Sequence, residues 1–107
     1  MASQAPIDAL LERYRESLHE IYGDRLERAV LFGSRARGDA GPDSDYDVAV
    51  FLCEMGNRFA EMDRLADLSA HILDETGEFI HAMPYLAGSY GERTPLMHEI
   101  RADRVHL

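Results

Sequence analysis

Cysteine is nearly absent from this chain of 107 residues, which contains only Cys53. A single cysteine excludes an internal disulfide and removes the usual cysteine spacings of zinc sites. Cys53 ends an apolar run, and free cysteines are among the most frequently buried residues, so we expect it in the core.

The sequence also lacks the hydrophobic segments that membranes and export require. No apolar run approaches the roughly 20 residues of a transmembrane helix. The first residues, MASQAPIDALLERYRESLHE, do not combine a basic start with an apolar block as a signal peptide does. We therefore expect a cytoplasmic protein that makes no contact with a membrane.

Positive charge is scarce as well. The chain carries 11 Lys and Arg against 20 Asp and Glu, a formal net charge of -9. Because non-specific nucleic-acid binding is driven by neutralisation of phosphates, this balance disfavours a direct nucleic-acid partner. It favours a basic protein partner or bound metal ions, although acidity for solubility alone explains most of these charges at least as well.

What the sequence does contain is an alternation of helical and strand patterns. The length suits one domain, residues 1–107. Apolar residues at helical spacing predict helices over residues 6–22 and from 59 to a stop at Gly77, and Thr94 followed by Pro95 predicts a last helix over 94–103. Short apolar runs predict strands over residues 26–32, 45–53 and 78–86, with Pro84 favouring a sheet edge for the third. This order predicts an α/β (α+β) fold, a small mixed β-sheet flanked by helices.

The most informative segment is LFGSRARGDAGPDSDYDVAVFL, residues 31–52, because it places aspartates at the mouth of an apolar strand. Side chains alternate along a strand, so Asp45 and Asp47 face the same side. Two neighbouring carboxylates stay ionised at low cost only when a cation lies between them. Their hard oxygen ligands suit Mg²⁺ or Mn²⁺. The alternative to a metal site is that Asp45 and Asp47 are simply solvated at the entrance of the strand. Asp43 is more often a turn residue than a metal ligand.

The turn before these aspartates fits a phosphate ligand. Gly33 lets the backbone approach a ligand closely, and Ser34 offers a hydroxyl and an N–H to phosphate oxygens. Arg35 and Arg37 could add charge-assisted contacts, although surface arginines pair with neighbouring carboxylates about as often. The turn would then hold a polyphosphate while the aspartates hold the metal that bridges it.

Gly33-Ser34, ten residues and then Asp45-x-Asp47 resembles the signature of the DNA polymerase β-like nucleotidyltransferase superfamily. GSRARGDAGPDSDYDVAVF resembles its smallest branch, the minimal nucleotidyltransferases. The resemblance implies the polymerase β-like nucleotidyltransferase fold and transfer of a nucleoside monophosphate from a triphosphate, with release of pyrophosphate. Similar members are antitoxins that transfer AMP from ATP to a tyrosine of a HEPN-domain ribonuclease toxin. It therefore implies ATP as substrate and a HEPN toxin as partner in a hetero-oligomer.

The same resemblance implies residue roles. Gly33 and Ser34 would bind the triphosphate, and Asp45 and Asp47 would ligate two Mg²⁺ ions. Active members usually carry a third carboxylate on the following strand, and here that place is held approximately by His81. Glu78 is the only acid nearby, but its parity is opposite to that of His81, so at most one of the two faces the aspartates. A neutral histidine could accept a proton, but it is a poor Mg²⁺ ligand.

Three functions remain open at this stage. The first is a Mg²⁺-dependent adenylyltransferase that acts on a partner protein, favoured by the intact Gly-Ser turn and aspartate pair. The second is an antitoxin that masks a basic toxin with weak or lost catalysis, favoured by the missing third acid. The third is an enzyme that modifies a small molecule, which the brevity of the chain disfavours.

Overall fold

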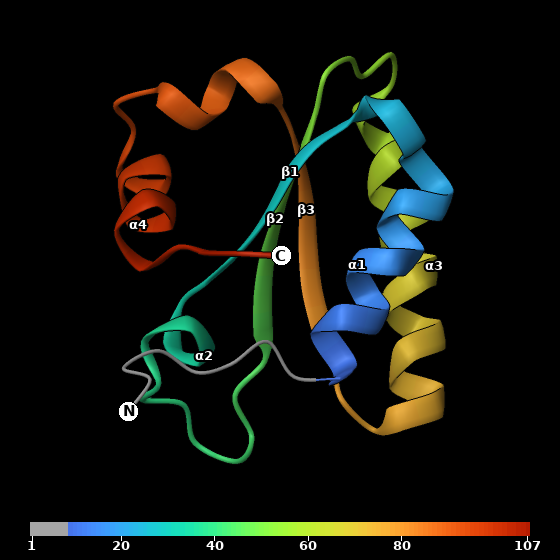
Figure 1. Cartoon of the computed structure of the whole chain (residues 1–107), viewed down its shortest axis with the longest axis vertical. Coiled ribbons are helices and arrows are strands. Elements are labelled where there is room, and N and C mark those ends of the chain that lie inside the picture. Colours follow the sequence, from blue (N-terminus) through green and yellow to red (C-terminus); the bar gives the residue numbers. More distant parts are fainter. Residues whose placement is uncertain (1–8) are drawn as a thin grey trace.

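The predicted helices and strands form in the computed structural model, which describes residues 9–107 (Figure 1), although the second and third strands begin at Tyr46 and Ile80 and not at residues 45 and 78. The helices are α1 (Ala9–Tyr22), α2 (Ser34–Arg37), α3 (Arg58–Thr76) and α4 (Pro95–Asp103), with the 3-10 turns η1 (Gly23–Arg25) and η2 (Ala87–Gly91). The strands are β1 (Leu26–Phe32), β2 (Tyr46–Leu52), β3 (Ile80–Leu86) and β4 (Val105–His106). The start predicted for the first helix, residues 6–8, lies outside the described residues.

The four strands form one mixed sheet in the order β3-β2-β1-β4. β1 is antiparallel to both β2 and β4, whereas β2 and β3 are parallel. A parallel pair cannot be joined by a tight turn, and α3 supplies the crossover that it needs. The mixed sheet is confirmed, and β3 is an edge strand as Pro84 predicted.

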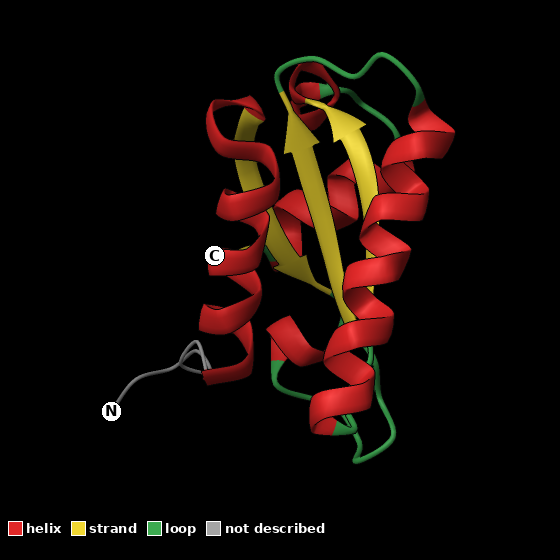
Figure 2. Cartoon of the chain, turned by 90° about the vertical axis from the view of Figure 1, so that its right-hand side faces the viewer, coloured by secondary structure: helices red, strands yellow, loops and turns green. Residues whose placement is uncertain are grey.

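Helices cover both faces of this sheet, which explains the apolar character of β2 (Figures 1 and 2). Val48, Val50 and Leu52 belong to a buried cluster with residues of α1 and α3. Ala49 and Phe51 belong to a second cluster with residues of α4 on the opposite face. Because neighbouring residues of a strand point to opposite faces, burial on both sides requires an unbroken apolar run.

The helix ends follow local chemistry. The Asn57 side chain accepts hydrogen bonds from the N–H groups of Phe59 and Ala60 at the start of α3, and Gly77 ends that helix at φ +79°. Thr94 caps α4 in the same way and is followed by Pro95, as predicted. None of the helices in residues 9–107 is long and apolar enough to cross a membrane.

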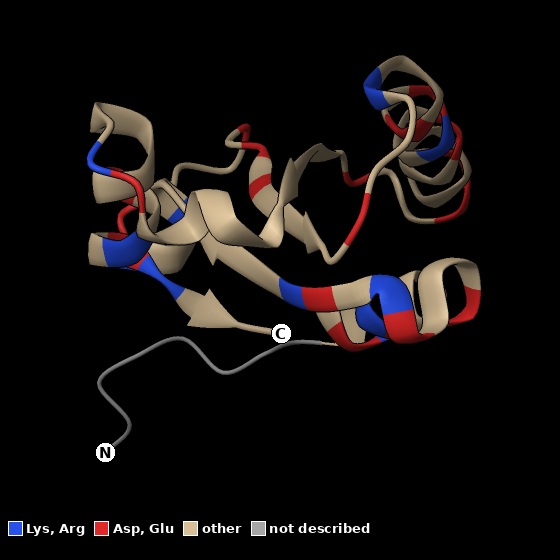
Figure 3. Ribbon diagram, turned by 90° about the horizontal axis from the view of Figure 1, so that it is seen from above, with Lys and Arg blue, Asp and Glu red and all other residues tan. Residues whose placement is uncertain are grey.

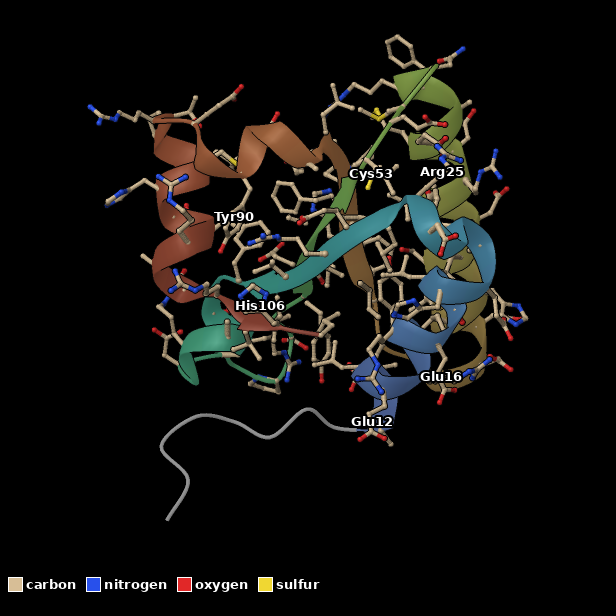
Figure 4. All side chains as sticks on the ribbon, turned by 45° about the horizontal axis from the view of Figure 1, so that its top comes forward. Glu12, Glu16, Arg25, Cys53, Tyr90 and His106 are labelled. Carbon is tan, nitrogen blue, oxygen red and sulfur yellow. The ribbon has the colours of Figure 1, made fainter. Side chains whose placement is uncertain are left out.

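The prediction of a core position for Cys53 is wrong. β2 ends at Leu52, and Cys53 is exposed in the bend that follows, near the connection between α1 and β1 (Figure 4). Its backbone N–H still donates to the carbonyl of Arg25. The apolar run therefore extends one residue beyond the strand. Burial ends at Leu52, which pairs with Leu26 of β1.

Candidate active site

Asp47 occupies the second position of β2, between the two neighbouring strands of the sheet. Its Cα partners are Phe32 on β1 and His81 on β3. Aligned residues of adjacent strands present their side chains on the same face. Accordingly, His81 Nδ1 lies 3.7 Å from Asp47 Oδ1, and the two side chains are 57% and 36% exposed. The structure thus brings together two residues that are 34 positions apart in the printed sequence.

The turn that follows β1 lies directly against Asp47. Gly33 directly precedes α2 and has φ +79° and ψ -161°, a backbone conformation that residues other than glycine rarely adopt. A Cβ atom added to Gly33 would lie 2.7 Å from Asp47 Oδ2. Glycine is therefore required twice, for the backbone angle and for the space that the carboxylate occupies. Ser34, the first residue of α2, follows at once and is half-buried.

Asp45 lies just before β2 and is exposed, and its charge reaches Asp47. Burial is the main reason why the pKa of Asp47 is raised above its ordinary value; His81 acts to lower this pKa and Asp45 to raise it. The raised pKa means that the anionic form of Asp47 is incompletely compensated by the described residues. A cation beside Asp45 and Asp47 would relieve this cost.

No three His, Cys, Asp or Glu side chains within residues 9–107 are grouped so that they could hold a metal ion. Asp45 and Asp47 offer two carboxylates at one strand entrance. This donor set fits an ion that completes its shell with water and substrate phosphates, as Mg²⁺ commonly does. It does not fit a structural metal enclosed by protein ligands.

The two arginines of α2 are engaged within the protein. Arg35 donates from Nε and Nη2 to the carbonyl of Ser44, at 3.0 and 2.8 Å, and its guanidinium lies 4.4 Å from the centre of the Tyr46 ring. Arg37 pairs with Asp39 at 3.1 Å and with Asp103 at 2.9 Å. Arg35 therefore ties the loop before β2 to α2. A contact of either arginine with a triphosphate stays a prediction.

Sequence reasoning missed Asp103, the last residue of α4. Its Oδ2 accepts hydrogen bonds from the N–H of Gly33, at 3.2 Å, and from Arg37. The side chain is only 13% exposed, so it fastens the glycine turn to a helix from the far end of the chain. The sequence holds no local signal for a contact across 70 positions.

Glu78, the other residue considered for the place of the third acid, lies before the start of β3. Its N–H donates to the hydroxyl of Thr76, in the connection between α3 and β3. Of these two residues, it is His81 that the register of β3 aligns with Asp47.

The sequence model of the nucleotidyltransferase domain family matches residues 11–94, which include the glycine turn, both aspartates and His81. The chain therefore belongs to this family of nucleotidyltransferases, as the motif predicted.

Comparison with known protein sequences adds a relative. Over 46 residues the chain is 39% identical to the "Putative protein adenylyltransferase MJ0141" of Methanocaldococcus jannaschii, a match that covers 43% of this chain and 46% of that protein. The chain thus spans about half the length of this relative.

Two solved structures share the fold. A toxin-antitoxin with AMP-PNP superposes with a TM-score of 0.63 and 18% identity, over 89% of this chain and 70% of that one. A mutant of the toxin-antitoxin MntA-HpeT superposes with a TM-score of 0.61 and 19% identity, over 90% and 70%. At these identities the likeness establishes the fold alone.

Proposed function

We propose that this protein is an antitoxin-type adenylyltransferase that transfers AMP from ATP to a tyrosine of a HEPN ribonuclease toxin and releases pyrophosphate. The observation that carries the proposal is the contact of the Gly33 turn with Asp47, beside Asp45 and His81. The adenylyltransferase name of the relative and the AMP-PNP in a structural neighbour support it. A single domain over residues 1–107 and a cytoplasmic location, where ATP is available, belong to the same proposal.

Each residue of the site has a proposed role in the transfer of AMP. The Gly33–Ser34 turn would bind the triphosphate through the N–H and hydroxyl of Ser34, because the Gly33 N–H donates to Asp103. Asp45 and Asp47 would hold two Mg²⁺ ions, which when bound neutralise charge on the phosphates. His81 would accept the proton of the tyrosine hydroxyl as its oxygen bonds to the α-phosphorus. The bond from the α-phosphorus to the bridging oxygen breaks at the same centre, and pyrophosphate leaves.

The test is to incubate the purified protein with ATP, Mg²⁺ and its cognate toxin and to measure the intact mass of the toxin. We expect the toxin to gain the mass of one AMP. Asp45→Ala and Asp47→Ala should each lower the rate at least about 100-fold, since each removes a carboxylate that positions the phosphates. Asp43→Ala removes an exposed carboxylate of the same loop and should keep the rate of the wild type.

The second candidate is direct masking of the toxin, and the absence of a third carboxylate beside Asp45 and Asp47 in the described residues favours it. Under masking, the toxin is inhibited without a change of mass, and equally by the wild type and both alanine variants. A mass change on a small-molecule acceptor but none on the toxin would instead select small-molecule modification. His81→Gln separates the roles within the first mechanism, because it should slow transfer while ATP binding persists.

A further inference from the structure

An apolar groove runs between α3 and the edge strand β3. It has a volume of about 270 Å³, and its lining includes Met62, Ala66, Ala70, Leu73, Ala82 and Met83. Two large apolar side chains of the lining, Leu73 and Phe79, are 43% and 38% exposed. Methionine side chains adapt to irregular shapes, so this groove can fit an apolar side chain of another protein.

The backbone of β3 at the groove is partly open. Tyr46 N–H donates to the carbonyl of Phe79, so in the parallel register the backbone groups of Ile80, Ala82 and Pro84 point away from β2. The carbonyl of Ile80 accepts from Ser69, and that of Pro84 from Arg58 at 2.9 Å.

Proline has no N–H, which leaves Ala82 as the residue within the groove whose N–H and carbonyl remain for a partner strand among the described residues. Ala82 is therefore the residue of the groove lining that offers both backbone groups to a partner strand.

The groove borders the candidate active site at His81. His81 lines the groove and also lies 3.7 Å from Asp47 Oδ1. A chain that pairs with Ala82 thus passes the neighbouring His81, which faces Asp47 on β2.

Charge around the groove indicates the nature of its occupant. Residues 58–81 contain six acidic side chains and two arginines. Arg58 keeps its charge while it donates to the Pro84 carbonyl, and Arg64 pairs with Glu61. The acids still outnumber the arginines, and Asp63, Asp67 and Asp74 are exposed. Acidic positions recur along α3 in Figure 3. A segment with basic residues is electrostatically complementary to this surface.

We propose that the groove binds an extended, basic segment of the acceptor protein. The segment adds one strand residue at Ala82, places an apolar side chain between α3 and β3, and directs its tyrosine to Asp47 and His81. This inference rests on the proposed function and names the surface that selects the protein substrate.

The test uses the peptide Lys-Arg-Val-Leu-Val-Tyr-Lys-Arg, titrated into the full chain and followed by backbone amide NMR. We expect the Ala82 amide to shift and to gain protection from hydrogen exchange. Ala70→Arg fills the groove from an exposed helix position and should weaken binding at least about tenfold, the effect of losing one well-packed contact. Ala60→Arg makes the same exchange at an exposed position of α3 outside the groove and should keep the wild-type affinity.

Thermal unfolding of both arginine variants tests whether they are folded, and we expect both to unfold cooperatively. Equal binding by wild type and Ala70→Arg, no binding at all, or equal binding of the same peptide with glutamates for its basic residues would each overturn the inference. So would a concentration-dependent dimer that Ala70→Arg disrupts, because the occupant would then be a second copy. Titration of the wild type with ATP and Mg²⁺ keeps the two proposals apart: ATP binding without groove binding refutes only the groove.

Discussion

At Gly33 a missing side chain lets two functional segments occupy adjacent space. The turn after β1 needs a positive φ, and the carboxylate of Asp47 fills the volume where a Cβ would lie. The spacing of the motif thus reflects a contact between the turn and the carboxylate, and not only the length of the loop that joins them.

Gly33→Ala tests this contact. The Gly33 backbone, at φ +79° and ψ -161°, lies in a region that essentially only glycine adopts, so its strain should cost about 1–3 kcal/mol of unfolding free energy. Displacement of Asp47 should weaken binding of Mg²⁺ and ATP at least about tenfold, as misplacement of a preorganised ligand does. Urea denaturation and calorimetric titration measure the two effects.

Gly38→Ala is the matched control, because Gly38 has φ +86° and open space around its Cα. Because Gly38 lies in the left-handed region and an added Cβ meets nothing there, Gly38→Ala should lose some stability, less than Gly33→Ala, and keep the ATP affinity. An equal loss of ATP affinity in both variants would mean that the contact with Asp47 is not the cause.

Some contacts of single residues in the candidate site could be predicted from the sequence, and others could not. Alternation along the strand placed Asp45 and Asp47 at one entrance, and parity left room for one of His81 and Glu78; the register then aligned His81 with Asp47. The partners of Arg35 were not predictable, because the Ser44 carbonyl and the Tyr46 ring reach it through the shape of the loop.

At the element scale, α3 is the crossover that makes β2 and β3 parallel, and it also forms one wall of the groove. Its start depends on Asn57, which accepts two N–H groups of the first turn at 2.9 and 3.2 Å. These N–H groups have no acceptor inside the helix. The Asn57 oxygen therefore supplies hydrogen bonds that water would otherwise have to make.

Asn57→Ala should lower the unfolding free energy by about 1 kcal/mol, the usual effect of removing an N-cap. Thermal or urea unfolding provides the measurement. Asn57→Asp retains an acceptor oxygen and should remain near wild type. If Asn57→Ala and Asn57→Asp are equally stable, the cap is not what stabilises the start of α3.

Elements were largely predictable because their signals are local: apolar periodicity, Thr94 with Pro95, and the glycine that ends α3. β4 was not predictable from the sequence. It consists of Val105 and His106, which form a strand only because they pair with the edge of β1. The predicted end of β2 was wrong for a related reason. Pairing with β1, and not hydrophobicity, decides where the strand ends, and Cys53 lies beyond that end.

At the scale of the whole molecule, polar contacts between distant segments hold the layers in place. Asp103 fastens α4 to the glycine turn. On the other side, Arg25 of η1 donates to Glu61 of α3 at 2.6 Å, beside the end of α1 (Figure 4). Glu61 is 6% exposed, so this pair lies largely out of water. Neither contact was visible in the sequence, because each joins segments that only the fold brings together.

The Glu61 pair predicts a pH effect on stability. Burial raises the pKa of Glu61, but the hydrogen bond and charge of Arg25, with smaller contributions from Tyr22 and Arg64, together lower the pKa below its ordinary value. A carboxyl group whose pKa is lower in the folded state stabilises the fold at pH values above its unfolded-state pKa. This stabilisation is lost as the pH falls through the folded-state pKa.

Glu61→Gln should therefore cost about 2 kcal/mol of unfolding free energy near neutral pH, with the difference from wild type shrinking below the unfolded pKa. Urea denaturation across that range measures it. Glu99→Gln, an exposed position on α4 with the same change of charge, is the control. A difference that does not vary with pH would contradict the role of the Arg25 pair.

The central claim, that Asp45 and Asp47 bind ATP through Mg²⁺ beside the Gly33 turn, is tested most directly by calorimetric titration of ATP with and without Mg²⁺. We predict a single site that requires Mg²⁺, weakened at least about tenfold in Asp45→Asn and Asp47→Asn, since each loses a charged ligand, and unchanged in Asp43→Asn. No heat for the wild type at saturating ATP, or equal affinity in Asp47→Asn and Asp43→Asn, would contradict the account.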